Sequence, residues 1–146
     1  TTGAASLLVR DIGRQNMGLT LDFGHCLMAT ENPVQSAALT GQEGKLFGVQ
    51  LNDGFVKPGC EDGLALGTVH PRMTLEFIYW LQRFDYQGHI YFDTFPINED
   101  PVREAEYNIR LYKKWWKFAS VLDEKGIGEL LIKQDTMAIL ELLEGR

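Results

Sequence analysis

The sequence contains little cysteine and lacks any long apolar run. Only 2 of its 146 residues are cysteines, Cys26 and Cys60. A chain of this size does not need disulfide bonds to fold, so we expect a reducing, cytoplasmic compartment. No apolar run approaches the roughly 20 residues of a membrane helix, and no secretory signal is recognisable at the start. We therefore expect no membrane partner.

Positive charge is scarce as well. The chain has 14 Lys and Arg residues against 20 Asp and Glu residues, which gives a formal net charge of −6. Polyanions bind to concentrated basic surfaces, whereas the cations here are scattered along the sequence. This balance argues against nucleic acid as a partner and favours a neutral or metal-bound small molecule.

The length and apolar content indicate one domain over residues 1–146. A hydrophobic content of 45% in 146 residues is enough for a single ordinary core. The chain opens at Thr1 without a methionine and enters a helical pattern almost at once. We interpret it as a piece of a longer protein.

Apolar periodicity predicts helices that alternate with strands. Helices are expected over residues 4–12, 33–39, 74–83, 100–122 and 134–143, and strands over residues 17–23, 46–53 and 89–95. The first helix is expected to bury Leu7, Leu8 and Ile12, and the long helix to bury a stripe at Ile109, Tyr112, Trp116 and Ala119. Thr74 is expected to cap its helix.

This alternation implies an α/β fold with about three parallel strands joined by right-handed crossovers. Three strands do not close a barrel, and the outer two would leave exposed edges. We therefore expect a homo-oligomer or association with a missing N-terminal half. The long glycine-containing stretch over residues 54–69 is expected to be a loop that covers a substrate.

Polar residues recur near the carboxyl ends of the three expected strands. Asp22, Gln50 and Asp93 hold these places, and His25 follows Asp22 by three residues. Parallel strands build their sites at this end. Carboxylates with an imidazole and an amide oxygen suit a divalent cation such as Mg²⁺ or Mn²⁺. Such an ion would polarise a sugar carbonyl while a carboxylate moves the proton.

Each of these residues also has a purely structural interpretation. Taken singly, Asp22 and Asp93 could equally well cap the following helix or bind loop amides instead of forming a site. His25 could be an ordinary hydrogen-bonded histidine, and Gln50 could bond a neighbouring strand. Glu61 could be a solvated loop acid. The recurrence over three consecutive strands is what favours a site.

Four segments together resemble a known superfamily. They are Leu-Asp-Phe-Gly-His at residues 21–25, Gly-Val-Gln-Leu-Asn-Asp at 48–53, Gly-Thr-Val at 67–69 and Tyr-Phe-Asp-Thr-Phe-Pro at 91–96. Their order and spacing resemble the xylose-isomerase-like TIM-barrel superfamily, and its rhamnose-isomerase-like branch in particular. The resemblance covers residues 4–120 but only the second half of that barrel. It implies the C-terminal half of a (β/α)8 barrel from a metal-dependent sugar isomerase or epimerase.

The resemblance also implies roles for individual residues. Asp22 matches the aspartate that binds the catalytic metal, and His25 the histidine that helps to hold a second ion. Asp93 matches the last acidic metal ligand and is the carboxylate expected to take part in catalysis. Glu61 or Asp62 falls near an acidic loop cluster that assists the second ion. Mn²⁺ or Mg²⁺ is the expected ion, with Zn²⁺ or Co²⁺ possible.

Gln50 departs from the pattern, because relatives usually carry a metal-binding histidine at this strand position. Its carbonyl oxygen is expected to contact the sugar instead, together with Asn52. The family's remaining metal glutamate lies on earlier strands, outside the matched half. A second interpretation therefore stays open, in which the chain is a non-catalytic sugar-binding or structural half-barrel that has lost its metal. The superfamily's DNA-repair nucleases are disfavoured by the acidic charge and by the presence of only 3 histidines.

Overall fold

The computed structural model describes residues 1–145 and has an α/β fold. Its strands are β1 (Leu19–Asp22), β2 (Leu46–Leu51) and β3 (His89–Phe92), which form one parallel sheet in the order β1-β2-β3. The helices within this range are α1 (Thr2–Ile12), α2 (Phe23–Met28), α3 (Pro33–Gln42), α4 (Pro71–Arg83), α5 (Pro101–Glu124), α6 (Ile127–Lys133) and α7 (Thr136–Leu143). The predicted alternation of helices with three parallel strands is confirmed.

The two faces of the sheet differ in character. Leu21 pairs with Val49, and both are buried against the helices. Asp22 pairs with Gln50 and Gln50 with Tyr91, so these three side chains share the opposite face. Tyr91 is exposed on that face and Gln50 is partly exposed. The sheet therefore packs on one side and leaves a polar surface on the other.

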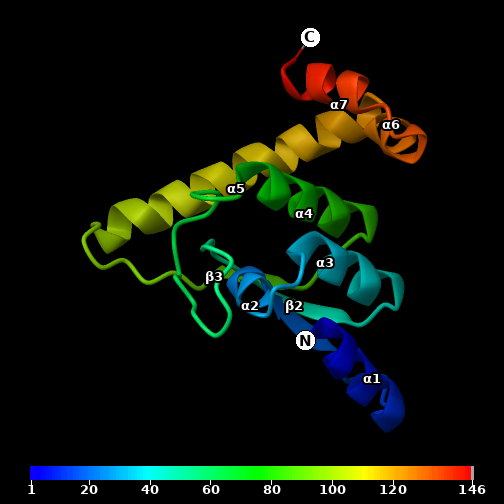
Figure 1. The fold of residues 1–146 in the computed structure, drawn as a ribbon, viewed down its shortest axis with the longest axis vertical. Coiled ribbons are helices and arrows are strands. Elements are labelled where there is room, and N and C mark those ends of the chain that lie inside the picture. The colour runs from blue at the N-terminus through cyan, green and yellow to red at the C-terminus, as the bar shows by residue number, and fades with distance from the viewer. Residues whose placement is uncertain (146) are drawn as a thin grey trace.

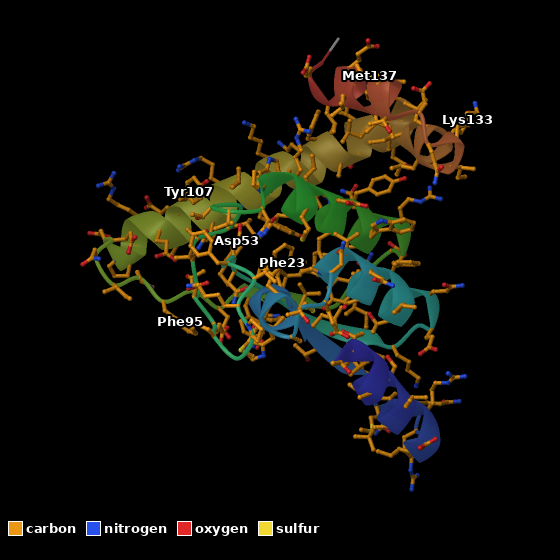
Figure 2. All side chains as sticks on the ribbon, viewed as in Figure 1. Phe23, Asp53, Phe95, Tyr107, Lys133 and Met137 are labelled. Atoms are coloured by element: carbon orange, nitrogen blue, oxygen red, sulfur yellow. The ribbon has the colours of Figure 1, made fainter. Side chains whose placement is uncertain are left out.

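Two groups of apolar side chains form the core. The first joins the sheet to α2, α3 and α4 and includes Phe23, which lies in the interior of the molecule (Figure 2). The second lies between α4, α5 and α6. Figure 1 shows α5 running along α4, with α6 and α7 at the far end of α5. Both groups share four aromatic residues packed against them: Trp80, Tyr112, Trp115 and Trp116.

Two of the expected helices begin at an Asx-proline pair. Asn32 accepts a hydrogen bond from the N–H of Val34 at 2.8 Å at the start of α3. Asp100 caps α5 in the same way, at 2.9 Å from the N–H of Val102. The prediction that Thr74 caps a helix, here α4, is wrong. α4 begins three residues earlier, and the Thr74 hydroxyl donates to the His70 carbonyl inside its first turn.

The strands are shorter than the sequence indicated, and a helix follows the first of them directly. β1 stops at Asp22 because its side chain accepts the N–H of His25 at 3.0 Å and caps α2. β3 stops at Phe92 rather than at residue 95, since the N–H of Phe95 turns to the carbonyl of Gly63 at 2.8 Å. Both changes turn the chain at the strand ends, where the polar residues gather.

The buried stripe predicted for the first helix is wrong. Leu7 and Leu8 are 59% and 57% exposed, and Val9 is the residue of α1 that packs inward. Figure 1 shows α1 extending away from the rest of the molecule. Its first turn is tied down by Glu31, whose carboxylate accepts the N–H of Thr2 at 2.8 Å.

The stripe predicted along α5 is correct only towards its C-terminal half. Ala119 is buried and Trp116 is partly buried, but Ile109 is 45% exposed. The N-terminal half of α5 extends beyond the end of α4 and has no second helix beside it (Figure 1). Within residues 1–145, no helix combines the length and the apolar character that crossing a bilayer requires.

Candidate metal centre

Asp22 stands at the carboxyl end of β1 and is 5% exposed. Its Oδ1 caps α2, while its Oδ2 is buried and has no hydrogen-bond partner in the described part of the chain. Burial raises the pKa of Asp22, and this outweighs the lowering by the N–H of His25. The structural interpretation of this acid as a helix cap thus accounts for one oxygen and leaves the other unexplained.

His25 and Glu61 lie beside this carboxylate. His25 comes from the first turn of α2 and Glu61 from the loop over residues 54–69, and His25 Nε2 is 3.0 Å from Glu61 Oε2. One ligand atom from each of Asp22, His25 and Glu61 falls within 4.8 Å of the others. Partial burial alone would lower the pKa of His25, but the carboxylates of Asp22 and Glu61 raise it. The three residues form a compact O, N, O donor set.

Asn52 holds these elements together. It is fully buried directly after β2, and its Oδ1 accepts the N–H of Gly24 at 2.7 Å. Its Nδ2 donates to Glu61 Oε1 at 3.2 Å and to the Asp93 carbonyl at 3.0 Å. A Cβ atom at Gly24 would lie 2.7 Å from Asn52 Oδ1, which explains the glycine there. Contact of Asn52 with a substrate does not fit this burial, so we assign it to positioning.

Gln50 faces a hollow on the uncovered side of the sheet. The hollow has a volume of about 520 Å³, and Asp22, His25, Gln50 and Tyr91 line it together with Glu31. The side chain of Gln50 makes no hydrogen bond to other described residues. A polar ligand in this hollow would touch the amide of Gln50 and two members of the donor set, Asp22 and His25.

Asp93 lies near the donor set but outside it. It follows β3, its N–H donates to the Leu51 carbonyl at 3.1 Å, and its side chain is partly exposed. Its charge helps to raise the pKa of His25, so the two groups are close enough to interact. The structure therefore brings Asp22, His25 and Glu61 together and leaves Asp93 at the margin.

Sequence reasoning missed a buried carboxylate and its histidine partner behind the site. Asp53 is fully buried; its Oδ2 accepts the N–H groups of Val69 and His70 at 2.8 Å each, and its Oδ1 lies 2.9 Å from His70 Nδ1. Oδ1 also accepts the N–H of Gly54 at 2.8 Å. Asp53 thus joins both ends of the loop that carries Glu61. The only signal in the sequence was an acid between a strand end and a glycine.

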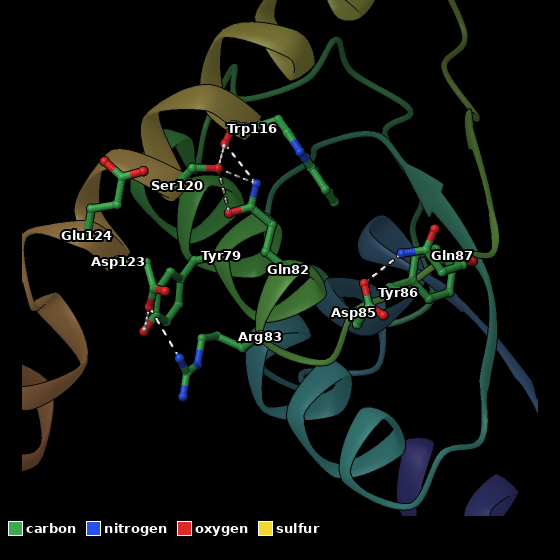
Figure 3. Close-up of a pocket in the computed structure, with 10 residues that line it drawn as sticks. All are labelled: Tyr79, Gln82, Arg83, Asp85, Tyr86, Gln87, Trp116, Ser120, Asp123 and Glu124. Atoms are coloured by element: carbon green, nitrogen blue, oxygen red, sulfur yellow. Dashed lines mark hydrogen bonds and ion pairs between the residues drawn. The ribbon is translucent and has the colours of Figure 1, made fainter.

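A second hollow, of about 440 Å³, lies between α4 and α5. Figure 3 shows its polar groups bonded to one another. Asp123 Oδ1 lies 3.3 Å from both the Tyr79 hydroxyl and Arg83 Nη1, and Gln82 Nε2 donates to the Trp116 carbonyl at 2.8 Å. These bonds connect α4 to α5. Asp22 Oδ2 remains the buried side-chain oxygen without a partner in residues 1–145.

Comparison with known proteins adds no family. No protein-family model matches the chain, and no curated protein sequence matches it.

Proposed function

We propose that Asp22, His25 and Glu61 bind a divalent cation, and that this site belongs to a sugar isomerase or epimerase. The buried Asp22 Oδ2 without a partner carries the proposal. A buried carboxylate oxygen without a hydrogen bond is costly unless a cation or donor satisfies it. The imidazole of His25 and the carboxylate of Glu61 lie where they would complete such a site.

The donor set selects the class of ion. Two carboxylates and one imidazole suit Mn²⁺ or Mg²⁺, and they also accept Zn²⁺ or Co²⁺. When bound, the ion would supply Lewis acidity towards a carbonyl and its neighbouring hydroxyl. Asn52 positions Glu61 through its amide, and Asp53 holds both ends of the loop on which Glu61 lies.

The remaining roles belong to residues that line or border the hollow. Gln50 and Tyr91 would orient hydroxyl groups of a sugar, since both face the hollow beside Asp22. Asp93, partly exposed and close to His25, is the carboxylate that would carry a proton between neighbouring carbons. The volume of the hollow, about 520 Å³, supports a small polyhydroxylated substrate rather than a polymer.

The scaffold that we propose is the C-terminal half of a (β/α)8 barrel. Three neighbouring parallel strands, a polar uncovered face and a site at the carboxyl ends of the strands support it. In a closed barrel this face would point inwards and the other half would supply further ligands. Association with such a half, or with another copy, is part of this proposal.

One observation favours a second candidate, a non-catalytic sugar-binding or structural half-barrel. The donor set has three members, with Asp93 outside it and Gln50 in the place where the resemblance implies a histidine. A site with few ligands holds its ion weakly. In this candidate the hollow would still bind a sugar through Gln50 and Tyr91, without turnover.

The test is a titration of the chelator-treated protein with Mn²⁺, followed by calorimetry and by thermal unfolding. We expect one bound ion per chain and a rise in unfolding temperature with ion concentration. Asp22→Asn should abolish both effects, whereas Asp11→Asn, an exposed acid on α1, should leave them unchanged. Failure of the wild-type protein to bind Mn²⁺, Mg²⁺, Zn²⁺ or Co²⁺ would overturn the cation proposal.

A sugar panel separates the two candidates. The ion-loaded protein is incubated with aldoses and ketoses, and products are read by chromatography. Interconversion that is lost in Asp93→Asn supports the enzyme. Binding of a sugar by calorimetry without any product supports the non-catalytic half-barrel.

A further inference from the structure

The long helix α5 carries a basic face on an otherwise acidic protein. We define the basic face of α5 by five exposed cations that make no ion pair within the described residues: Arg103, Arg110, Lys113, Lys114 and Lys117. Most of them recur at intervals of three or four residues and so form one stripe of the helix. The chain as a whole has a net charge of −6. The stripe is therefore a local concentration of positive charge without an acidic partner in residues 1–145.

The basic face also offers apolar contact. A shallow hollow of about 590 Å³ lies along it, lined by Ile109 and by side chains of the cations, with Glu106 as its single acid. Ile109 is 45% exposed. The stems of lysine and arginine provide apolar walls while their charged ends reach outwards. This surface suits a partner that is both apolar and acidic.

The far end of the same chain has that character. Six of the eight residues of α7 are apolar, yet none of its residues is buried. Met137 is 64% exposed and Ile132, on α6, is 85% exposed. Glu141 lies one helical turn after Met137, and Asp135 caps the helix. We call Ile132, Asp135, Met137 and Glu141 the acidic end.

We infer that two copies of the chain form a two-fold dimer, in which the acidic end of each copy packs on the basic face of α5 of the other. α5 has 24 residues and is therefore about 36 Å long. Figure 2 shows Tyr107 on its N-terminal half and Met137 beyond its C-terminal end. A two-fold axis that passes between the basic face and the acidic end of the chain brings each acidic end to the other copy's basic face, so both contacts form together.

Charge complementarity within the chain selects a second copy as the occupant. The basic face needs an acidic, apolar surface, and the acidic end exposes Met137 and Ile132 beside Asp135 and Glu141. A polyanion would meet the cations but would leave the apolar side chains of both surfaces uncovered. This dimer does not depend on the cation site, because the hollow beside Asp22 contains no residue of α5, α6 or α7.

Analytical ultracentrifugation of the full chain over a micromolar concentration series tests the dimer. We expect a reversible dimer that weakens as salt is added, because the contact is partly electrostatic. Lys113→Glu with Lys117→Glu should weaken it by about 100-fold. Glu141→Lys should also weaken it, and the combination of all three substitutions should recover much of the loss.

The control variant reverses the same number of charges at positions away from the basic face. Arg14→Glu with Arg72→Glu alters two exposed cations that make no ion pair within residues 1–145 and should leave the dimer unchanged. Circular dichroism of every variant checks that the fold is retained. A protein that stays monomeric throughout overturns the inference. So does a dimer that persists in both charge-reversed variants, since it would have to form through the sheet edges.

Discussion

The carboxylate of Asp22 meets two different demands. Its Oδ1 closes the first turn of α2, and its Oδ2 is buried without a hydrogen bond in the described residues. A carboxylate in this position destabilises the protein as long as no ion is bound. Side chains that cost stability in this way are typical of binding sites rather than of cores.

Asp22→Asn should therefore stabilise the ion-free protein by about 1 kcal/mol. The amide keeps an oxygen for the N–H of His25 and removes the buried charge. Urea unfolding in the presence of a chelator measures the change, with Asp11→Asn as the exposed control. A loss of stability instead would mean that the carboxylate is already satisfied in the folded protein.

Asp53 is the opposite case, because its buried carboxylate is fully bonded. An asparagine at this position has one oxygen, so it cannot accept from Gly54 on one side and from Val69 and His70 on the other. We expect Asp53→Asn to cost about 3 kcal/mol. Urea unfolding measures this loss, and hydrogen exchange should show faster exchange at Gly54 or at Val69 and His70, whichever side loses the oxygen. Unchanged exchange there would refute the role of Asp53 in closing the loop.

Only part of the donor set could be predicted from the sequence. Asp22 and His25 are three residues apart, so strand and helix geometry place them together, whereas Glu61 was assigned through the resemblance. For Asn52 the sequence indicated substrate contact, because its actual partners are distant. The partners of Asn52 lie 28, 9 and 41 residues away in the sequence.

Among the elements, the loop over residues 54–69 depends on charge for its local order. The N–H of Phe55 donates to Asp62 at 2.7 Å, and Lys57 lies 3.3 Å from the same carboxylate. These contacts lower the pKa of Asp62 below its ordinary value of 3.8. Their stabilising effect is therefore present above that ordinary value and is lost as the pH falls through the lowered one.

We expect the amide signal of Phe55 to stay constant from neutral pH into mild acid and to shift only at strongly acidic pH. Nuclear magnetic resonance follows this titration directly. In Asp62→Asn the acid-dependent shift should disappear, and exchange at Phe55 should be faster at neutral pH. A shift centred above pH 3.8 would contradict the lowered pKa.

The longer helices could be predicted and the shortest ones could not. Asn32-Pro33 and Asp100-Pro101 mark helix starts by local chemistry alone. α2 has only 6 residues, which is too few to show a helical period. The outer side of α1 was misassigned because an apolar stripe indicates that a helix packs, but not that its partner is within the same chain.

Over the whole molecule, the aromatic residues between α4 and α5 connect the two core groups. Trp80, Trp115 and Trp116 pack against both of them. We therefore expect a single cooperative unfolding transition. Tryptophan fluorescence and far-ultraviolet circular dichroism should give coincident urea curves, in the wild type and in Trp116→Phe. Separate transitions would show that the α5–α7 end unfolds independently of the sheet.

The parallel order of the sheet followed from the alternation of helices and strands, which leaves few other topologies. The uncovered face did not follow, because parallel sheets are ordinarily covered on both sides. Gln50 and Tyr91 fit the pattern of a strand whether that face of the sheet is covered or not. What covers a sheet is decided by packing between distant elements, and strand periodicity carries no information about it.

The amide of Asn52 limits how freely this protein can diverge. Its oxygen accepts a hydrogen bond from the backbone of Gly24. Its NH₂ group donates two more, to the side chain of Glu61 and to the backbone carbonyl of Asp93. Aspartate would lose both donors, and leucine would leave all three groups unpaired in the interior. A descendant with another residue at position 52 would need compensating replacements in three separate segments, so this site should tolerate exchange less than the leucines around it.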